Sequence, residues 1–157
     1  MNLEVWLFLS VTQMVQIVND LTFTKKIDFL KSIGSDEADH SGRTLLDHLI
    51  GTSEKLREMG APQYLQDAGL FHSVYGTAYF MPEKGLVNDR QIIKDLIGEQ
   101  AEEIAYWFCV LDKPRITEIL KFDGQLKEDL LTLEKINQLD QMKDDSVTMT
   151  WEEAYGI

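Results

Sequence analysis

The segment TLLDHLIGTSEKLREMGAPQYLQDAGLFHSV, residues 44–74, decides the fold of this chain. Its first half predicts a helix over Thr44–Met59, because neutral side chains recur at helical spacing on one face and charged side chains occupy the other. We expect the following side chains to face inward: Leu45, Leu46, His48, Leu49, Thr52 and Leu56. The turn GAP ends this helix, and a mostly apolar helix over Pro62–Val74 follows. The segment therefore predicts two antiparallel helices at the centre of an all-α domain.

Helical patterns also cover most of the chain on both sides of this pair. They predict further helices over residues 3–18, Thr24–Ile33, Asp89–Ile97, Glu99–Leu111 and Gln125–Met142, the last with Leu126, Leu130, Leu133, Ile136 and Leu139 as its apolar stripe. We find no convincing pair of strands. The connection over Gly76–Asn88 is long, and long connections are often functional. We expect one all-α domain over residues 1–157, with six or seven helices, a core at about residues 24–142 and a C-terminal tail, residues 143–157, on its surface.

The composition is ordinary for a soluble globular chain, except for its charge. The 157 residues suffice for one domain with a sizeable core, and 44% of them are hydrophobic. The formal net charge of −12 argues against nucleic acids and anionic membranes as partners, because an acidic surface repels both. It does not exclude a phosphorylated small molecule in a locally positive pocket. A single cysteine, Cys109, rules out an internal disulfide and fits a reducing compartment, so we expect a cytoplasmic protein.

The first eighteen residues are apolar enough to need an interpretation. A secretory signal needs a basic start and a small-residue cleavage site, and neither is present. Polar residues such as Glu4 and Gln13 interrupt the run, so a membrane span is not expected. We expect instead a helix whose apolar side packs on the domain or on another subunit, which makes this helix the candidate contact for a homo-oligomer.

His40, His48 and His72 are the only histidines in the chain. Neutral imidazole is the commonest metal ligand in proteins, and a ligand needs a rigid platform to hold its geometry. His48 belongs to the inward face of one central helix and His72 to the end of the next, so the helix pair could bring them together. The alternative is that both are buried structural histidines, and spacing alone leaves this open.

Three motifs occur in a fixed order around these histidines. Ser41-Gly42 precede His48, the stretch AGLFHS covers residues 68–73, and IGEQAEEIA covers residues 97–105. Their order and spacing resemble the HD-domain superfamily, an all-helical fold of metal-dependent phosphohydrolases, and are most similar to its (p)ppGpp hydrolase domains. The chain looks closer still to small uncharacterised HD-like domains with an HSxYGT motif, represented here by HSVYGT at residues 72–77.

The resemblance implies a metal site with His48 and His72 as ligands, although this chain departs from the family pattern. Ser73 stands where the family has an aspartate, and a neutral hydroxyl is a poorer ligand for a hard divalent ion. The acid pair of the (p)ppGpp hydrolases is absent as well. For the last ligand, an aspartate on a later helix, Glu134 is the candidate here, and the alternative is a solvated glutamate. His40 is either an additional ligand or a loop residue that lines the pocket.

Four residues near the histidines are candidates for the substrate pocket. Arg43 could contact an anionic substrate or form a surface ion pair. Ser73, Tyr75 and Thr77 could form a hydroxyl-lined rim around the metal or the substrate. The alternative for these three is a capped helix end with the tyrosine packed against the core.

We expect a metal-dependent enzyme that uses a divalent iron, manganese or zinc ion. It would be a phosphohydrolase acting on a small phosphorylated or nucleotide-like substrate, or an iron-dependent oxygenase, since two histidines and one carboxylate suit redox-active iron. Three histidines would suit zinc with a bound water. The alternative, motivated by the missing acids, is a degenerate HD-like domain that binds a small ligand or a protein partner without chemistry. A third interpretation is a purely structural oligomer subunit.

Overall fold

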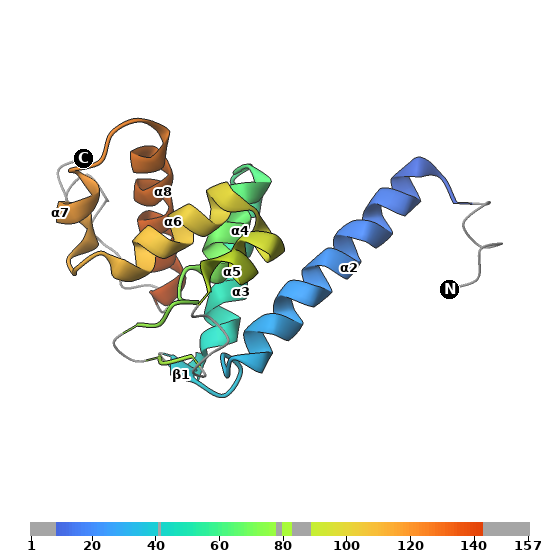
Figure 1. Ribbon diagram of the computed structural model, residues 1–157, viewed down its shortest axis with the longest axis horizontal. Coiled ribbons are helices and arrows are strands. Elements are labelled where there is room, and N and C mark those ends of the chain that lie inside the picture. The colour runs from blue at the N-terminus through green and yellow to red at the C-terminus, as the bar shows by residue number, and fades with distance from the viewer. Residues whose placement is uncertain (1–8, 41, 78–79, 83–88, 143–157) are drawn as a thin grey trace.

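The computed structural model describes residues 9–40, 42–77, 80–82 and 89–142. Within them the chain forms seven helices and one pair of very short strands (Figure 1). The elements in chain order are α2 (Val11–Ser32), β1 (Asp39–His40), β2 (Arg43–Thr44), α3 (Leu45–Glu58), α4 (Gln63–Phe71), α5 (Arg90–Ile97), α6 (Glu99–Val110), α7 (Arg115–Ile119) and α8 (Gly124–Gln141). The prediction of an all-α fold is confirmed. No helix among the described residues is long and apolar enough to cross a membrane.

Helix α3 begins with a reciprocal cap. The backbone N–H of Asp47 donates to the Thr44 hydroxyl at 3.1 Å, and the N–H of Thr44 donates to the Asp47 carboxylate at 3.2 Å. These bonds satisfy two of the N–H groups that a helix start otherwise leaves without partners. All six side chains of α3 that were expected to face inward are buried.

Helices α3 and α4 form the centre of the molecule, and α6 and α8 pack against them. Their contact is close because α4 carries a glycine at the crossing point. A Cβ atom added to Gly69 would lie 2.5 Å from Cδ1 of Leu56, so a larger residue would push the two helices apart. Phe71 on α4 and Phe108 on α6 are among the largest fully buried side chains. This pair of helices therefore holds His48 and His72 on a rigid support.

Helix α2 is one continuous helix where the sequence predicted two. It joins residues 11–18 of the expected N-terminal helix to the expected Thr24–Ile33 helix, while residues 3–8 lie outside the described residues. Only its C-terminal part is anchored, because Leu30 is buried and Lys26 Nζ forms an ion pair with Asp67 at 2.7 Å. The remainder of α2 projects away from the other helices (Figure 1).

Two further expectations need correction. A strand pair was not predicted, yet Asp39 pairs with Thr44 and His40 with Arg43, with Gly42 between them at a φ of 85°. Two residues per strand are too few to leave a pattern in the sequence. Helix α7 was also missed, since five residues are too few to show helical periodicity. The C-terminal tail and most of the connection after Thr77 lie outside the described residues.

The apolar stripe of α8 was placed partly wrongly. Leu130, Leu133 and Ile136 are buried as expected, whereas Leu139 is 44% exposed. The inward face instead continues through Asn137 and Asp140, both of which are buried. This face keeps the spacing of three and four residues from Leu130 onward, so two polar side chains point into the molecule between α3 and α4.

Candidate functional site

A pocket of about 400 Å³ lies at the ends of the central helices. Its walls come from the strand pair, α3, the end of α4, the segment before α7, and α8. The lining residues are Asp39, His40, His48, His72, Ser73, Thr77, Lys113, Arg115, Asn137 and Gln141. The pocket therefore brings together all three histidines and two of the predicted hydroxyl residues.

His48 is fixed in orientation by a buried carboxylate on α8. Its Nδ1 donates to Oδ2 of Asp140 at 2.7 Å, and both side chains are 1% exposed. The same carboxylate accepts a hydrogen bond from Lys55 Nζ at 2.7 Å and pairs with Arg43. Burial raises the pKa of Asp140, but the hydrogen bonds from His48 and Lys55 and the charge of Arg43 outweigh burial and hold the pKa well below its usual range. Asp140 is thus a permanent negative charge behind His48.

His72 is fixed in the same way by the backbone of its own helix. Its Nδ1 donates to the carbonyl oxygen of Gly69 at 2.6 Å, and its ring meets the edge of Phe108 at 5.2 Å between centroids. Burial, followed by the nearby His48, lowers the pKa of His72 to about 3. The imidazole is therefore neutral at physiological pH, and its Nε2 carries a lone pair.

The Nε2 atoms of the two rings point toward each other. His48 Nε2 lies 3.1 Å from His72 Nε2 and 2.9 Å from Oδ1 of Asn137. Three atoms capable of donating a lone pair thus converge from α3, α4 and α8. Two lone pairs at this distance would repel each other, so the arrangement can be completed either by a hydrogen atom on one of the two nitrogens or by a metal ion between them.

His40 is the third histidine of the pocket. Its ring stacks on that of His48 with 4.4 Å between centroids, and its Nε2 is one of two buried side-chain atoms without a hydrogen-bond partner among the described residues. Burial, followed by the charges of His48 and Arg43, lowers its pKa. His40 therefore presents a neutral ring and an unsatisfied nitrogen beside the cluster.

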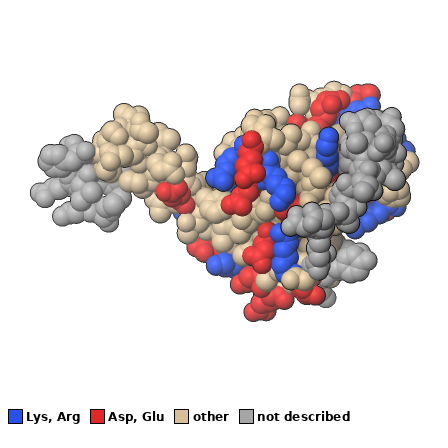
Figure 2. Space-filling view, turned by 180° about the vertical axis from the view of Figure 1, so that it is seen from behind, with Lys and Arg blue, Asp and Glu red and all other residues tan. Residues whose placement is uncertain are grey.

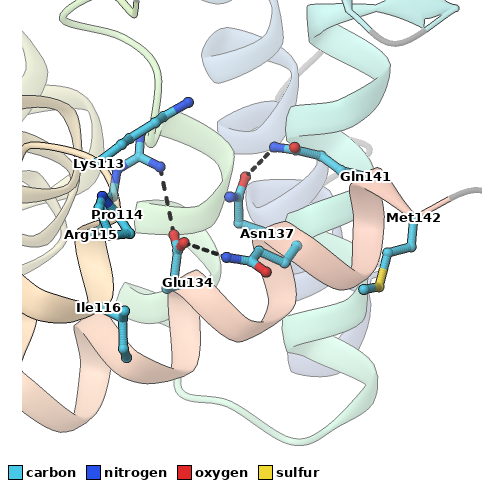
Figure 3. Close-up of a pocket in the computed structure, with 9 residues that line it drawn as sticks. Lys113, Pro114, Arg115, Ile116, Glu134, Asn137, Gln141 and Met142 are labelled. Carbon is cyan, nitrogen blue, oxygen red and sulfur yellow. Dashed lines mark hydrogen bonds and ion pairs between the residues drawn. The ribbon is translucent and has the colours of Figure 1, made fainter. Parts of the chain in front are cut away.

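Glu134 lies apart from the histidine pair. Its carboxylate accepts a hydrogen bond from Gln138 at 2.7 Å and lies 3.6 Å from Nη1 of Arg115 (Figure 3). It lines a neighbouring pocket of about 630 Å³ that shares Lys113, Arg115, Asn137 and Gln141 with the histidine pocket. The residue of α8 that reaches the histidines is Asn137, one helical turn further along. The other buried atom without a hydrogen-bond partner among the described residues is Oε2 of Glu134, the oxygen that faces Arg115.

The four predicted substrate-pocket residues are divided between three places. Ser73 and Thr77 line the histidine pocket. Arg43 lies behind it, where Nη2 donates to the Asp140 carboxylate and to the Asp140 backbone oxygen at 2.7 Å. Tyr75 is not among the lining residues, because its hydroxyl donates to the buried Glu102 at 2.5 Å.

Sequence reasoning missed Asn137 and Asp140, and with them Lys113 and Arg115 on the pocket wall. A signal for the first two was present, since both continue the inward spacing that begins at Leu130. No comparable signal marked Lys113 or Arg115, which flank Pro114 at the start of α7. They line the pocket because the chain that enters α7 passes beside it, and no pattern in the sequence predicts that path.

The charges and donors of the pocket define what it can do. It combines a convergent set of two ring nitrogens and one amide oxygen with two cationic side chains, Lys113 and Arg115, and one carboxylate, Asp39, in a protein whose net charge is −12. Among the described residues, no group of three or more His, Cys, Asp or Glu side chains is arranged to hold a metal ion. The convergent set has two histidines, and its third member is an amide.

Comparison with protein families gives one match, to a domain of unknown function (DUF6817), over residues 29–113, more than half of the chain. The chain belongs to this family. The DUF6817 segment begins within α2 and ends before α7, so it contains all three histidines and Ser73. Asn137 and Asp140 lie beyond it on α8. No curated protein and no solved structure matches the chain.

Proposed function

We propose that the pocket binds one divalent transition-metal ion between His48 and His72, and that the protein is a metal-dependent enzyme acting on a small phosphorylated substrate. The observation that carries this proposal is the approach of the two Nε2 atoms to 3.1 Å while both Nδ1 atoms are engaged elsewhere. The resemblance of the ordered motifs around His48 and His72 to the HD-domain superfamily supports the same pair of ligands.

The donor set fits such an ion. Metal–nitrogen bonds of about 2.0–2.1 Å at a near right angle place two ligand nitrogens about 3 Å apart. Metal-bound histidines commonly donate their other N–H to a carboxylate or a backbone carbonyl, and here Asp140 and Gly69 accept those hydrogen bonds. Oδ1 of Asn137 offers a third ligand atom, and imidazole ligands suit iron and zinc.

The chain's own residues would bind and orient the substrate. A bound divalent ion acidifies a coordinated water molecule and polarises a phosphoryl oxygen. Lys113 and Arg115 place positive charge on the pocket wall, where a phosphate group would be attracted. The hydroxyls of Ser73 and Thr77 can donate hydrogen bonds to phosphate oxygens, and Nε2 of His40 can accept a proton because its ring is neutral.

One observation favours a second candidate, a non-catalytic domain that binds a small anionic ligand. The convergent set contains no carboxylate, since its third member is the amide of Asn137 and Ser73 stands in place of the family's aspartate. A proton on Nε2 of His48 would satisfy Asn137 and His72 as acceptors and close the network without a metal. The positive wall of the pocket would then serve binding alone.

Metal analysis of the full-length protein separates the two candidates. We expect protein purified without chelator, or reloaded with iron(II), manganese or zinc, to contain about one ion per chain. The loaded protein should release inorganic phosphate from one member of a panel of phosphate monoesters and nucleotides. A wild-type protein that takes up none of the three metals would overturn the proposal and favour the non-catalytic domain. Metal uptake without phosphate release would overturn only the assigned reaction.

Substitutions at the proposed ligands, with a control on α8, test which residues bind the metal. Asn137→Asp adds a charge to the ligand set and should raise metal affinity, whereas Asn137→Leu and His72→Ala should lower it. Glu134→Gln changes a carboxylate one turn away that faces Arg115, and it should leave metal content unchanged. Equal effects of Glu134→Gln and Asn137→Leu would contradict the assignment of Asn137.

A further inference from the structure

The exposed part of α2 turns polar side chains, and not its apolar ones, toward the rest of the molecule. Gln16, Asn19, Asp20, Phe23 and Lys26 line a crevice of about 490 Å³ between α2 and the side chains of α3 and α4. Apart from Phe23, the side chains by which this exposed part of α2 lines the crevice are therefore polar. A surface helix normally turns its apolar face toward the core.

The apolar face of α2 points away from the body. Val11, Met14, Val18 and Leu21 follow the alternating spacing of three and four residues that forms one stripe on a helix. A rotation of 100° per residue places this stripe opposite Gln16 and Phe23. Val11 is 77% exposed, Val18 and Leu21 are more than half exposed, and Met14 is half-buried. In Figure 2 the projecting part of the molecule carries few charged atoms. The stripe ends at Lys25, which would occupy its next position.

We propose that this stripe is the contact between two copies of the chain, whose α2 helices pair in antiparallel orientation. The stripe is complementary to itself in that orientation. When a two-fold axis crosses the helix at the height of residue 16, Val11 lies opposite Leu21 of the second copy and Met14 lies opposite its Val18. Every apolar residue of the stripe then meets another apolar residue.

Charge selects the antiparallel over the parallel arrangement. Each chain has a formal net charge of −12, and the helices of the body all follow α2 in the chain. Parallel pairing would place the two acidic bodies side by side and set Lys25 against its own copy. Antiparallel pairing places the bodies at opposite ends of the helix pair, which reduces repulsion between like charges. The opposed directions of the two helices also favour it, because their dipoles then attract.

The contact is small, so the dimer should be weak. From Val11 to Leu21 the helix rises about 15 Å, which is about one and a half heptads, whereas long-lived coiled coils use more. An interface of this size belongs to the transient class, with a dissociation constant on the order of micromolar. The equilibrium is independent of the metal and of the proposed reaction.

Analytical ultracentrifugation of the full chain over a range of micromolar concentrations tests the proposal. We expect a monomer–dimer equilibrium in the wild type and a dissociation constant at least tenfold higher in Val18→Glu. Asn19→Glu adds the same negative charge at the next residue of α2, which lines the crevice and not the apolar stripe. This variant should dimerise like the wild type. A wild type that stays monomeric, or equal effects of the two substitutions, would overturn the proposal.

Disulfide cross-linking tests the orientation. Val11→Cys and Leu21→Cys proteins mixed under oxidising conditions should give cross-linked dimers that contain one chain of each. Val11→Cys alone should not cross-link to itself through position 11, because the two copies of this position are about 15 Å apart along the pair. A prominent homodimer of Val11→Cys would show parallel pairing and contradict the antiparallel arrangement.

Discussion

At the scale of single residues, the geometry of the pocket depends most on Asp140. Its carboxylate accepts hydrogen bonds from His48, Lys55 and Arg43, which reach it from α3 and from β2. A buried carboxylate with three donors is stable as an anion, and it fixes which nitrogen of His48 carries the proton. Asp140 is therefore a positioning residue that acts through His48.

Asp140→Asn should weaken both metal binding and folding. An amide has one acceptor oxygen in place of two and carries no charge, so Lys55 and His48 lose their charged partner. We expect metal affinity to fall about 10–100-fold and the free energy of unfolding to fall by about 1–3 kcal/mol. Metal titration and urea unfolding measure the two effects. Glu128→Gln, an exposed acid on the same helix, should change neither.

A second buried acid, Glu102, should make stability depend on pH. Arg90 donates to its carboxylate from Nε at 2.6 Å and Nη2 at 2.8 Å, and Tyr75 donates at 2.5 Å. Burial raises the pKa of Glu102, but the hydrogen bonds from Arg90 and Tyr75 outweigh it and lower the pKa. Because the folded-state pKa is depressed, the stabilisation is present above the ordinary glutamate value and disappears as the pH falls through the folded-state value.

Urea unfolding of wild type and Glu102→Gln at a series of pH values measures this contribution. We expect the wild type to be more stable near neutral pH. The difference should shrink as the pH falls below about 5, where the unfolded wild-type chain begins to bind a proton at this residue. A difference between the two proteins that does not change with pH would contradict the assignment.

At the scale of the helices, the pocket depends on how closely α8 approaches α3. Gly51 on α3 makes the approach possible, because a Cβ atom added there would collide with the Asp140 carboxylate. Alanine normally stabilises a helix relative to glycine by about 1 kcal/mol. Here it would displace the acceptor of His48, so packing opposes helix propensity.

Gly51→Ala should therefore destabilise the protein in spite of its higher helix propensity. We expect a net loss of about 1–2 kcal/mol, since overpacking of a close contact typically costs about 1–3 kcal/mol. The sign of the change in urea unfolding decides the question. A more stable variant would show that α8 can move away from α3 without loss.

The sequence was sufficient for the helices that carry regular patterns. All six inward positions of α3 were predicted, because a two-faced helix of fourteen residues leaves a clear spacing. The same reasoning placed His48 and His72 on neighbouring helices. Short elements such as β1, β2 and α7 were missed because two to five residues are too few to show a periodic pattern.

The wall of the pocket on α8 could be predicted only in part. Expecting only apolar residues on the inward face led to Leu139, whereas polar Asn137 and Asp140 occupy that face. The search for a carboxylate ligand led to Glu134, whose actual neighbours are Arg115 and Gln138. Which polar residue of a helix faces a partner depends on the rotation of that helix, and the rotation is set by packing.

At the scale of the whole molecule, α2 is attached to the body only by its last turns. Leu30 is fully buried, and Lys26 forms an ion pair with Asp67 in which both side chains are about nine-tenths buried. The earlier residues of α2 contribute exposed surface and no core contacts. One end of this helix is therefore part of the folded body, whereas the other end is surface.

Deletion of residues 1–18 should leave folding unchanged and abolish self-association. At a concentration where the wild type is monomeric, we expect the free energy of unfolding to change by less than about 0.5 kcal/mol. Leu30→Ala, a substitution at the anchored end, should lower it by about 2–5 kcal/mol. A large loss of stability on deletion would show that the projecting part of α2 supports the fold.

The hydrogen bond between His48 and Asp140 joins residues that are 92 positions apart in the chain. Synthesis on the ribosome runs from the N-terminus, so α3 and α4 are made well before α8. A nascent chain that has not reached α8 has neither the acceptor for His48 nor the amide of Asn137. At that stage the metal ion that we propose would have at most two of its three protein ligands, so we expect it to be bound only after the chain is complete.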